Sequence, residues 1–301
     1  MWQRRVYTRF FRSLLAVGVL AIGLSATDAD DLAHKTYVVG DSRDQIIATL
    51  RASYTTPICF GDYLEAHAPR FEGVRYGAGG AGCGEYQTLI NVKQMDCVTF
   101  VENMLALATT SRELHAQWRT ADTAHFSDDY LLARFVHHLN AIRYYQGTNC
   151  GWESRIHYFT DALRQLADNQ LALDVGQFLG EAYTKRISYL SDHKRAFPGI
   201  DDWEALGSLE SELSSAQRFF VPLSEIYRYE QFAQTGDIVA LATDVQGLDV
   251  SHVGFMHVEN GELYMTHASS KNRKVELKVN FCDYMGRRTT ITGLVVYRPV
   301  L

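Results

Sequence analysis

Two runs of residues typical of β-strands flank the dipeptide Asn260-Gly261. An Asn-Gly pair between such runs is a strong signal for a β-hairpin with a two-residue turn. This turn fixes the register of the strands and places Gly254 opposite His267, although a strand glycine is also typical of a bulge. Side chains alternate between the faces of a strand, so His252 shares a face with Gly254 and lies diagonal to His267. The hairpin therefore predicts two neighbouring histidines.

A third histidine of the same segment, His257, lies an odd number of positions from His252. We expect it to face the opposite side of the sheet and to take no part in a site built around His252. A three-residue turn would reverse this assignment. A single strand histidine is more often a packed, hydrogen-bonded residue than a functional one.

Cys97 stands at the beginning of an apolar helix, directly after Asp96, a good N-cap residue. A cysteine at a helix N-terminus faces unpaired N–H groups and the positive end of the helix dipole, which lower its pKa. The alternative is a buried cysteine that acts as a small hydrophobic residue. Together with the histidine pair, Cys97 is a candidate nucleophile, with His252 as the base and His267 as the group that orients it. The backbone N–H of Cys97 is the expected oxyanion donor.

Three short segments carry a resemblance to a known superfamily: Asp-Cys at 96–97, His-Val-Gly at 252–254 and His-Ala-Ser at 267–269. They resemble the NlpC-type, papain-like cysteine peptidases and amidases of the bacterial cell wall. The closer similarity is to the N-acetylmuramoyl-L-alanine amidase-like branch, and it extends from about residue 73 to residue 299. The segments that carry it are 96–102, 155–161, 187–191 and 247–254.

The resemblance implies a cysteine amidase with a Cys97, His252 and His267 triad that cleaves the amide between N-acetylmuramic acid and L-alanine. Its expected substrates are peptidoglycan fragments (muropeptides), including anhydro forms. It also implies that Tyr76 lines the site beside the nucleophile. Within the motif at 155–161, Arg155 could hold a carboxylate of the stem peptide and Tyr158 could stack on a sugar. The alternative is that this motif only packs against the core.

Other functions remain open at this point. A γ-D-glutamyl endopeptidase would cut inside the stem peptide, with Asp96 and Tyr76 holding the free amine of an L-alanine terminus. A non-catalytic muropeptide-binding module and an acyltransferase are further alternatives, because a thioester can react with an amine in place of water. A zinc site formed by Cys97, His252 and His267 is also geometrically possible, although we expect no metal and no cofactor.

The pattern along the chain predicts an α+β fold of helices and an antiparallel sheet. The resemblance implies an NlpC-type, papain-like core, in which an N-terminal helix presents the nucleophile to histidines on that sheet. The chain from 30 to 301 is expected to form one catalytic domain, with a helical insertion at about 112–218. Within the insertion we expect helices at 127–147, 157–168 and 203–214, with a further helical region at 178–190. The expected later strands are 219–221, 238–242, 252–258, 263–267, 275–279 and 291–297.

Residues 1–29 have the charged and then apolar order of a secretory signal peptide. We therefore expect a periplasmic or secreted protein. The apolar run is shorter than the roughly 20 residues of a spanning helix, so we expect no membrane span in the mature chain. The net charge of −6 disfavours nucleic acid and anionic membranes as partners. The oligomeric state is left open.

The chain has five cysteines. Setting Cys97 aside leaves Cys59, Cys83, Cys150 and Cys282, which could form up to two disulfides of unknown pairing in an oxidising compartment. The sequence has no Cys-x-x-Cys pattern, which excludes a zinc ribbon and a thioredoxin-type motif.

Overall fold

The computed structural model describes residues 36–53, 59–77, 87–118, 126–286 and 288–300. The expected signal peptide and Cys83 lie outside these residues. In the described part of the chain, no helix combines the length and the apolar character needed to cross a bilayer.

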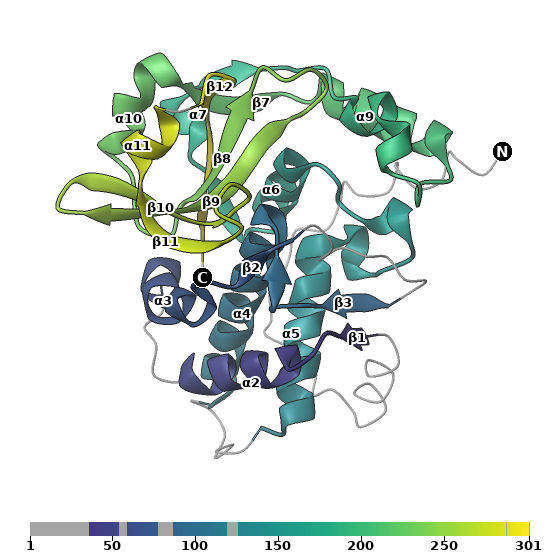
Figure 1. Ribbon diagram of the computed structural model, residues 1–301, viewed down its shortest axis with the longest axis vertical. Helices are drawn as coiled ribbons and strands as arrows, with labels where there is room; N and C mark the ends of the chain where they lie inside the picture. Colours follow the sequence, from purple (N-terminus) through teal and green to yellow (C-terminus); the bar gives the residue numbers. More distant parts are fainter. Residues whose placement is uncertain (1–35, 54–58, 78–86, 119–125, 287, 301) are drawn as a thin grey trace, which may run out of the picture.

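A large mixed sheet forms the centre of the fold (Figure 1). The order of its strands is β4-β2-β11-β10-β9-β8-β12-β7-β6, and β5 also pairs with β12. All of these pairs are antiparallel except β2 with β4 at one edge, so the expected sheet contains one parallel pair. The strands are β2 (Arg75–Tyr76), β4 (Gln94–Met95), β5 (Ala172–Asp174), β6 (Glu181–Tyr183), β7 (Arg218–Pro222), β8 (Ile238–Thr243), β9 (Val250–Glu259), β10 (Glu262–Ser269), β11 (Lys274–Asn280) and β12 (Ile291–Pro299).

All six strands expected after residue 218 are confirmed, and the β9–β10 hairpin has the predicted register. Asn260 and Gly261 form its two-residue turn, with φ of +53° and +81°, as a type I′ turn requires. Cα pairs run from Glu259 with Glu262 to Phe255 with Thr266, so the next position opposes Gly254 to His267.

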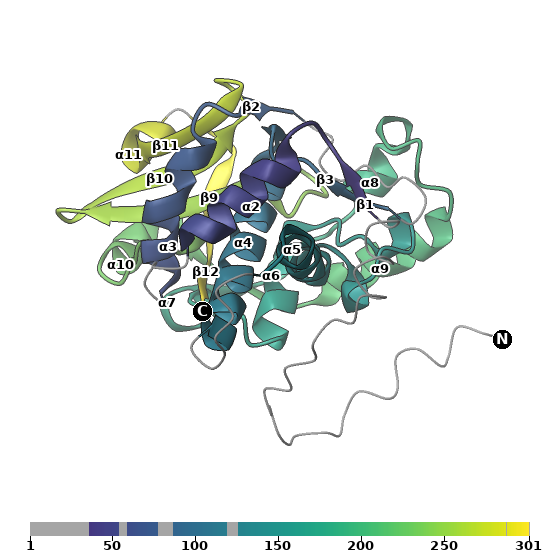
Figure 2. The ribbon, with the colours of Figure 1, turned by 90° about the horizontal axis from the view of Figure 1, so that it is seen from below.

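The helices of the N-terminal part lie together beside this sheet, as Figures 1 and 2 show. The longest is α4 (Cys97–Trp118), which packs against α5 (Asp128–Arg143) and against β9 and β10. Buried side chains of both helices and of the sheet share one core. The other elements are β1 (Thr36–Val38), α2 (Ser42–Ala52), α3 (Phe60–His67), β3 (Thr88–Ile90), α6 (Phe159–Asp168), α7 (Gly176–Leu179), α8 (Tyr189–Asp192), α9 (Trp203–Ser215), α10 (Ile226–Glu230) and α11 (Phe281–Met285).

The segment expected to be a helical insertion is part of this fold. Position 112 lies within α4, and β5 and β6 of this segment extend the central sheet. The helices α5, α6 and α9 occupy the expected regions, but α5 ends at Arg143, before the predicted stop. The prediction of a helical region at 178–190 is largely wrong, because β6 and two four-residue helices occupy it.

Cys59, Cys97, Cys150 and Cys282 carry free thiols. The disulfides that the sequence allowed among Cys59, Cys150 and Cys282 are therefore not formed. Cys59 instead begins α3, where its sulfur accepts a hydrogen bond from the backbone N–H of Asp62.

Candidate active site

Asp96 follows the short strand β4 and caps α4, so that Cys97 is the first residue of the helix. The backbone N–H of Thr99 donates to Oδ1 of Asp96 at 2.8 Å, and the N–H of Asp96 donates to the hydroxyl of Thr99 at 2.9 Å. This reciprocal capping fixes the start of the helix. The local sequence thus accounts for the position of Cys97 in the fold.

The Cys97 sulfur lies where α4 meets β9, because backbone N–H groups of Val253, Val98 and Cys97 all interact with it. These donors lower the pKa of the thiol, but burial and then the charge of Asp96 have the larger, opposite effect. They raise the pKa of Cys97 to about 12. The expectation of a lowered thiol pKa is therefore wrong for this structure, and the thiol is protonated at neutral pH.

The two predicted histidines are in contact with each other. One of them, His252, precedes Val253, whose backbone N–H interacts with the Cys97 sulfur. Nε2 of His252 on β9 lies 2.7 Å from Nδ1 of His267 on β10, and the ring planes are perpendicular. Both side chains are buried, with 4% and 1% exposure. His257 faces away from them, between Glu65 and Thr266, as expected.

Both imidazoles are neutral at physiological pH. Burial, then the charges of His267 and Arg288, lower the pKa of His252 well below its usual value. Burial lowers the pKa of His267 to about 4, with Glu276 opposing and Arg288 adding to this effect. A neutral His252 can accept a proton from a thiol. In the resting site, the Cys97 thiol is therefore the acid and the His252 imidazole is the base, and both are uncharged.

Glu276 lies on β11 and is the cross-strand partner of His267. It is therefore the next polar side chain after the two histidines. Its Oε2 lies 4.0 Å from Nε2 of His267, a buried atom with no hydrogen-bond partner among the described residues. If His252 donates from Nε2 to His267, then Nε2 of His267 carries the other proton, directed at Glu276. Nδ1 of His252 is then the atom that can accept a proton.

Tyr284 and Arg288 are site residues that sequence analysis missed. The ring of Tyr284 on α11 packs against both histidines, with centroids 5.0 Å from His267 and 5.8 Å from His252. Cζ of Arg288 lies 4.3 Å from the Tyr284 ring centroid. No motif or periodicity marks these positions, because α11 is one short helix after β11.

Tyr76 lies on a strand that is close to Cys97. It belongs to β2 and pairs with Met95 of β4, two residues before Cys97. Burial, then the charges of Cys97 and Asp96, raise the pKa of Tyr76 to about 12. Its half-buried hydroxyl is therefore a hydrogen-bond donor at neutral pH.

Arg155 and Tyr158 do not lie free in the site. Nη2 of Arg155 contacts Oε1 of Glu102 at 2.5 Å, and Nη1 donates to the carbonyl of Arg143. The Tyr158 hydroxyl donates to Glu210 at 2.6 Å. Both side chains are buried. Their expected roles in substrate binding are corrected to roles in packing, because their polar groups already have internal partners.

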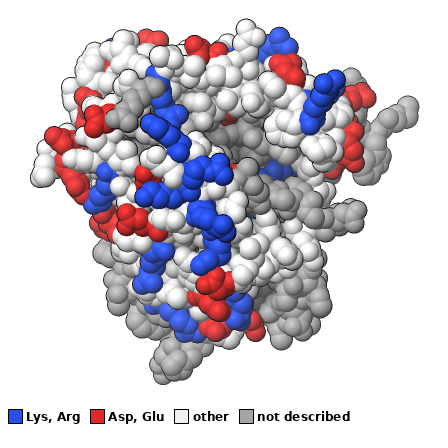
Figure 3. Space-filling model, viewed as in Figure 1, with Lys and Arg blue, Asp and Glu red and all other residues white. Residues whose placement is uncertain are grey.

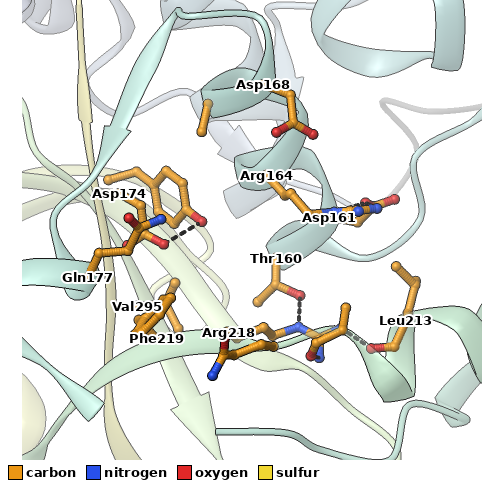
Figure 4. Close-up of a pocket in the computed structure, with 14 residues that line it drawn as sticks. Thr160, Asp161, Arg164, Asp168, Asp174, Gln177, Leu213, Arg218, Phe219 and Val295 are labelled. Carbon is orange, nitrogen blue, oxygen red and sulfur yellow. Dashed lines mark hydrogen bonds and ion pairs between the residues drawn. The ribbon is translucent and has the colours of Figure 1, made fainter. Parts of the chain in front are cut away.

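A separate polar pocket lies between α6, α9 and the sheet (Figure 4). Arg218 donates there to the hydroxyl of Thr160 and to the Leu213 carbonyl, and Asp174 accepts from the hydroxyl of Tyr297. None of the expected site residues lines this pocket. Across the described residues, no group of three or more His, Cys, Asp or Glu side chains could hold a metal ion.

Comparison with known structures gives several similar folds. An N-acetylmuramoyl-L-alanine amidase from Bacteroides uniformis is 24% identical, with a TM-score of 0.66, covering 87% of this chain and 100% of the other. A putative xylanase from Bacteroides fragilis is 29% identical, with a TM-score of 0.64, covering 76% and 97%. A Legionella pneumophila protein is 18% identical, with a TM-score of 0.63, covering 92% and 97%. No match was found among curated protein sequences.

The amidase structure at this level of identity supports the shared fold alone. The stronger result concerns the sequence family: its description is N-acetylmuramoyl-L-alanine amidase-like (AmiA-like), and its match covers residues 67–291. This range includes the start of α4, both histidines and Tyr284. With three quarters of its length matched, the chain belongs to the N-acetylmuramoyl-L-alanine amidase-like family.

Proposed function

We propose that this protein is a cysteine amidase that hydrolyses the bond between the lactyl group of N-acetylmuramic acid and L-alanine in muropeptides. One observation carries the proposal: in a member of an amidase-like family, Cys97 begins α4 beside β9, whose buried His252 contacts His267 on β10. A helix N-terminus supplies N–H donors for an oxyanion, and a neutral imidazole supplies a base.

The chemistry begins from a neutral thiol. As the sulfur of Cys97 attacks the amide carbon, its proton passes to Nδ1 of His252, and the carbonyl oxygen becomes an oxyanion facing the N–H of Cys97. His252 then gives this proton to the amide nitrogen, the C–N bond breaks, and the stem peptide leaves with the free amine of its N-terminal L-alanine. A water molecule, deprotonated by His252, attacks the thioester. The product is the lactyl carboxylic acid, and the thiol is restored.

His267 and Glu276 act through His252 in this scheme. The contact between Nε2 of His252 and Nδ1 of His267 fixes the orientation of the base. Glu276, 4.0 Å from the far nitrogen of His267, favours the tautomer that leaves Nδ1 of His252 unprotonated. Both are therefore positioning residues.

The test is mass spectrometry of defined muropeptides after incubation with the mature protein. Wild type should release an intact stem peptide that begins with L-alanine, and Cys97→Ala should release none. Cys150→Ala is the matched control, because its thiol is free, exposed and outside the site. It should retain wild-type activity.

Other products would assign a different reaction. Release of an L-alanyl-D-glutamate fragment would contradict the amidase proposal and support the endopeptidase, in which Asp96 and Tyr76 hold the free amine. Transfer to an added amine would indicate an acyltransferase. Binding without cleavage, unchanged in Cys97→Ala, would support a non-catalytic muropeptide-binding module.

We also propose that the protein is exported to the periplasm or beyond. The order of charged and apolar residues in 1–29 supports this location. Fractionation of cells that produce the full chain, with mass spectrometry of its N-terminus, is the test. An uncleaved chain in the cytoplasm would overturn the proposal.

A further inference from the structure

Five basic side chains lie together along β2, the β10–β11 turn and the segment after α11. Arg75 is the cross-strand partner of Lys274, and the carbonyl of Arg273 accepts from the N–H of Tyr76 at 2.8 Å. Figure 3 shows Lys and Arg side chains gathered in a band on this face. We call this group the basic rim, and its members are Arg75, Lys271, Arg273, Lys274 and Arg288.

The basic rim is not neutralised by close ion pairs within the part of the chain that the structure describes. Among the described residues, none of its members has a carboxylate within 4.0 Å. Lys278, farther along β11, is by contrast paired with Glu65 and Glu259. The whole chain is acidic, with a net charge of −6, so a local cluster of unpaired cations is not a general property of its surface.

A cavity of about 500 Å³ opens between part of the basic rim and the histidine pair. Lys271 and Arg288 line it, together with Tyr284 and Glu276. Tyr284 also packs directly against His252 and His267, so it is shared between the wall of the cavity and the histidine pair. A ligand in this cavity would contact Tyr284, which in turn contacts both histidines.

Two carboxylates also line this cavity, and one of them already accepts hydrogen bonds from within the protein. Nδ2 of Asn272 lies 2.9 Å from both carboxylate oxygens of Glu276, which also faces His267. Asp283 is the second, on the exposed side of α11. Among the described residues, neither Lys271 nor Arg288 has a carboxylate within 4.0 Å, although the Arg288 guanidinium packs on the ring of Tyr284. Counted over the whole basic rim, five cations exceed these two carboxylates, which suits an anionic ligand.

We propose that the basic rim binds the carboxylates of the stem peptide while the scissile amide lies at Cys97. This inference rests on the proposed function, because it assumes that the leaving group is a peptide. N-acetylated sugars are uncharged, whereas a stem peptide carries several free carboxylates. Guanidinium groups match a carboxylate in a bidentate geometry, and the long side chain of Lys271 adds a mobile point charge.

The test measures steady-state kinetics on two muropeptides that differ only in the stem peptide, one with free carboxylates and one with each carboxylate amidated. Lys271→Gln and Arg273→Gln should each raise KM for the acidic substrate roughly three- to tenfold, with kcat within about twofold. Both changes should leave KM for the amidated substrate almost unaltered. Added salt should raise KM for the acidic substrate alone.

Arg195→Gln is the matched control, because Arg195 is exposed, outside the basic rim and without an ion pair among the described residues. It should leave both KM values unchanged. Equal KM changes for the two substrates, or no change in the rim variants, would overturn the proposal even if the amidase activity is present.

A binding measurement separates this proposal from the amidase function. The free stem peptide is titrated into Cys97→Ala protein and into the same protein with Lys271→Gln and Arg273→Gln. Weaker binding by the rim variants supports the carboxylate site whether or not cleavage is ever observed. Equal affinity, or no binding by either protein, contradicts the site while leaving the cleavage assay to decide the reaction.

Discussion

Nε2 of His252 lies 2.7 Å from Nδ1 of His267, so the candidate base is held by a second imidazole and not by a carboxylate. A carboxylate partner would stabilise the imidazolium that forms when the base takes a proton. Here the nearest such charge is Glu276, on the far side of His267. Orientation, more than charge compensation, is therefore the expected contribution of His267.

Replacing each histidine should separate these two contributions. His252→Ala should lower kcat roughly 1,000-fold or more, because the base is lost. His267→Ala should lower kcat about 10- to 100-fold, because only the orientation is lost. Rates of muropeptide cleavage are the measurement, with His257→Gln on the opposite face as the control. Equal losses in both alanine variants would show that His267 is more than a positioning residue.

Glu276→Gln should shift the pH profile as well as the rate. The carboxylate raises the pKa of His267, so its removal should lower that pKa further. The two imidazoles are in contact and titrate as a pair, so the first protonation of the pair, which sets the acidic limb of kcat, should move toward lower pH. We expect roughly a tenfold lower kcat at pH 7, with partial rescue in Glu276→Asp. An unshifted limb would mean that Glu276 does not act through the histidines.

The raised pKa of Cys97 predicts slow alkylation at neutral pH. Only the thiolate reacts, and a thiol with a pKa of about 12 is almost fully protonated at pH 7. Labelling by iodoacetamide, followed by peptide mass spectrometry, should therefore be slower at Cys97 than at the exposed Cys150, and should still be rising with pH at about pH 10. Fast labelling of Cys97 at pH 7 would instead indicate a thiolate–imidazolium pair.

The same pKa shifts define the pH dependence of turnover. The active form needs a neutral His252, whose pKa is well below 6.5, and a protonated Cys97 at the start of each cycle. Activity should stay on a plateau from about pH 6.5 to pH 9 and fall only as acid protonates His252. A bell-shaped profile with its alkaline limb near pH 8 would contradict the neutral resting pair.

Gly254→Ala should disturb the histidine pair from the opposite strand. A Cβ at this position would lie 2.9 Å from Cβ of His267 and 2.7 Å from the Thr266 carbonyl oxygen, too close for either to remain in place. We expect a loss of activity of at least about tenfold and a destabilisation of about 1–3 kcal/mol. Gly199→Ala is the control, since its Cβ would meet no atom within 4 Å.

Arg155→Ala should reduce stability and leave the chemistry intact. Glu102 is buried between Arg143 and Arg155, so the loss of one partner leaves its charge half compensated. The free energy of unfolding in urea should fall by about 3 kcal/mol, while KM of the folded enzyme stays unchanged. Arg43→Ala, which breaks an exposed pair with Asp129, should cost less than about 1 kcal/mol. A raised KM in Arg155→Ala would restore its role in binding.

Local sequence signals determined the frame of the site. The Asn260-Gly261 turn and the alternation of strand side chains were sufficient to bring His252 and His267 together, because a hairpin register depends on neighbouring residues alone. Asp96 was sufficient to begin α4 at Cys97, because capping acts within one helical turn. The fold around them, a mixed sheet with packed helices, followed the strand pattern after residue 218, whereas β2, β4, β5 and β6 were not predicted.

Only the tertiary structure decided which side chains surround Cys97 and the two histidines. The β10–β11 pairing shifts register between Met265 and His267, and this irregularity, which no turn residue announces, brings Glu276 opposite His267. Long-range packing also brought the ring of Tyr284 against the histidines and paired Arg155 with the buried carboxylate of Glu102. The protonation of Cys97 also depends on tertiary structure. Burial by distant segments raises the pKa of the thiol by more than the N–H groups at the helix N-terminus lower it.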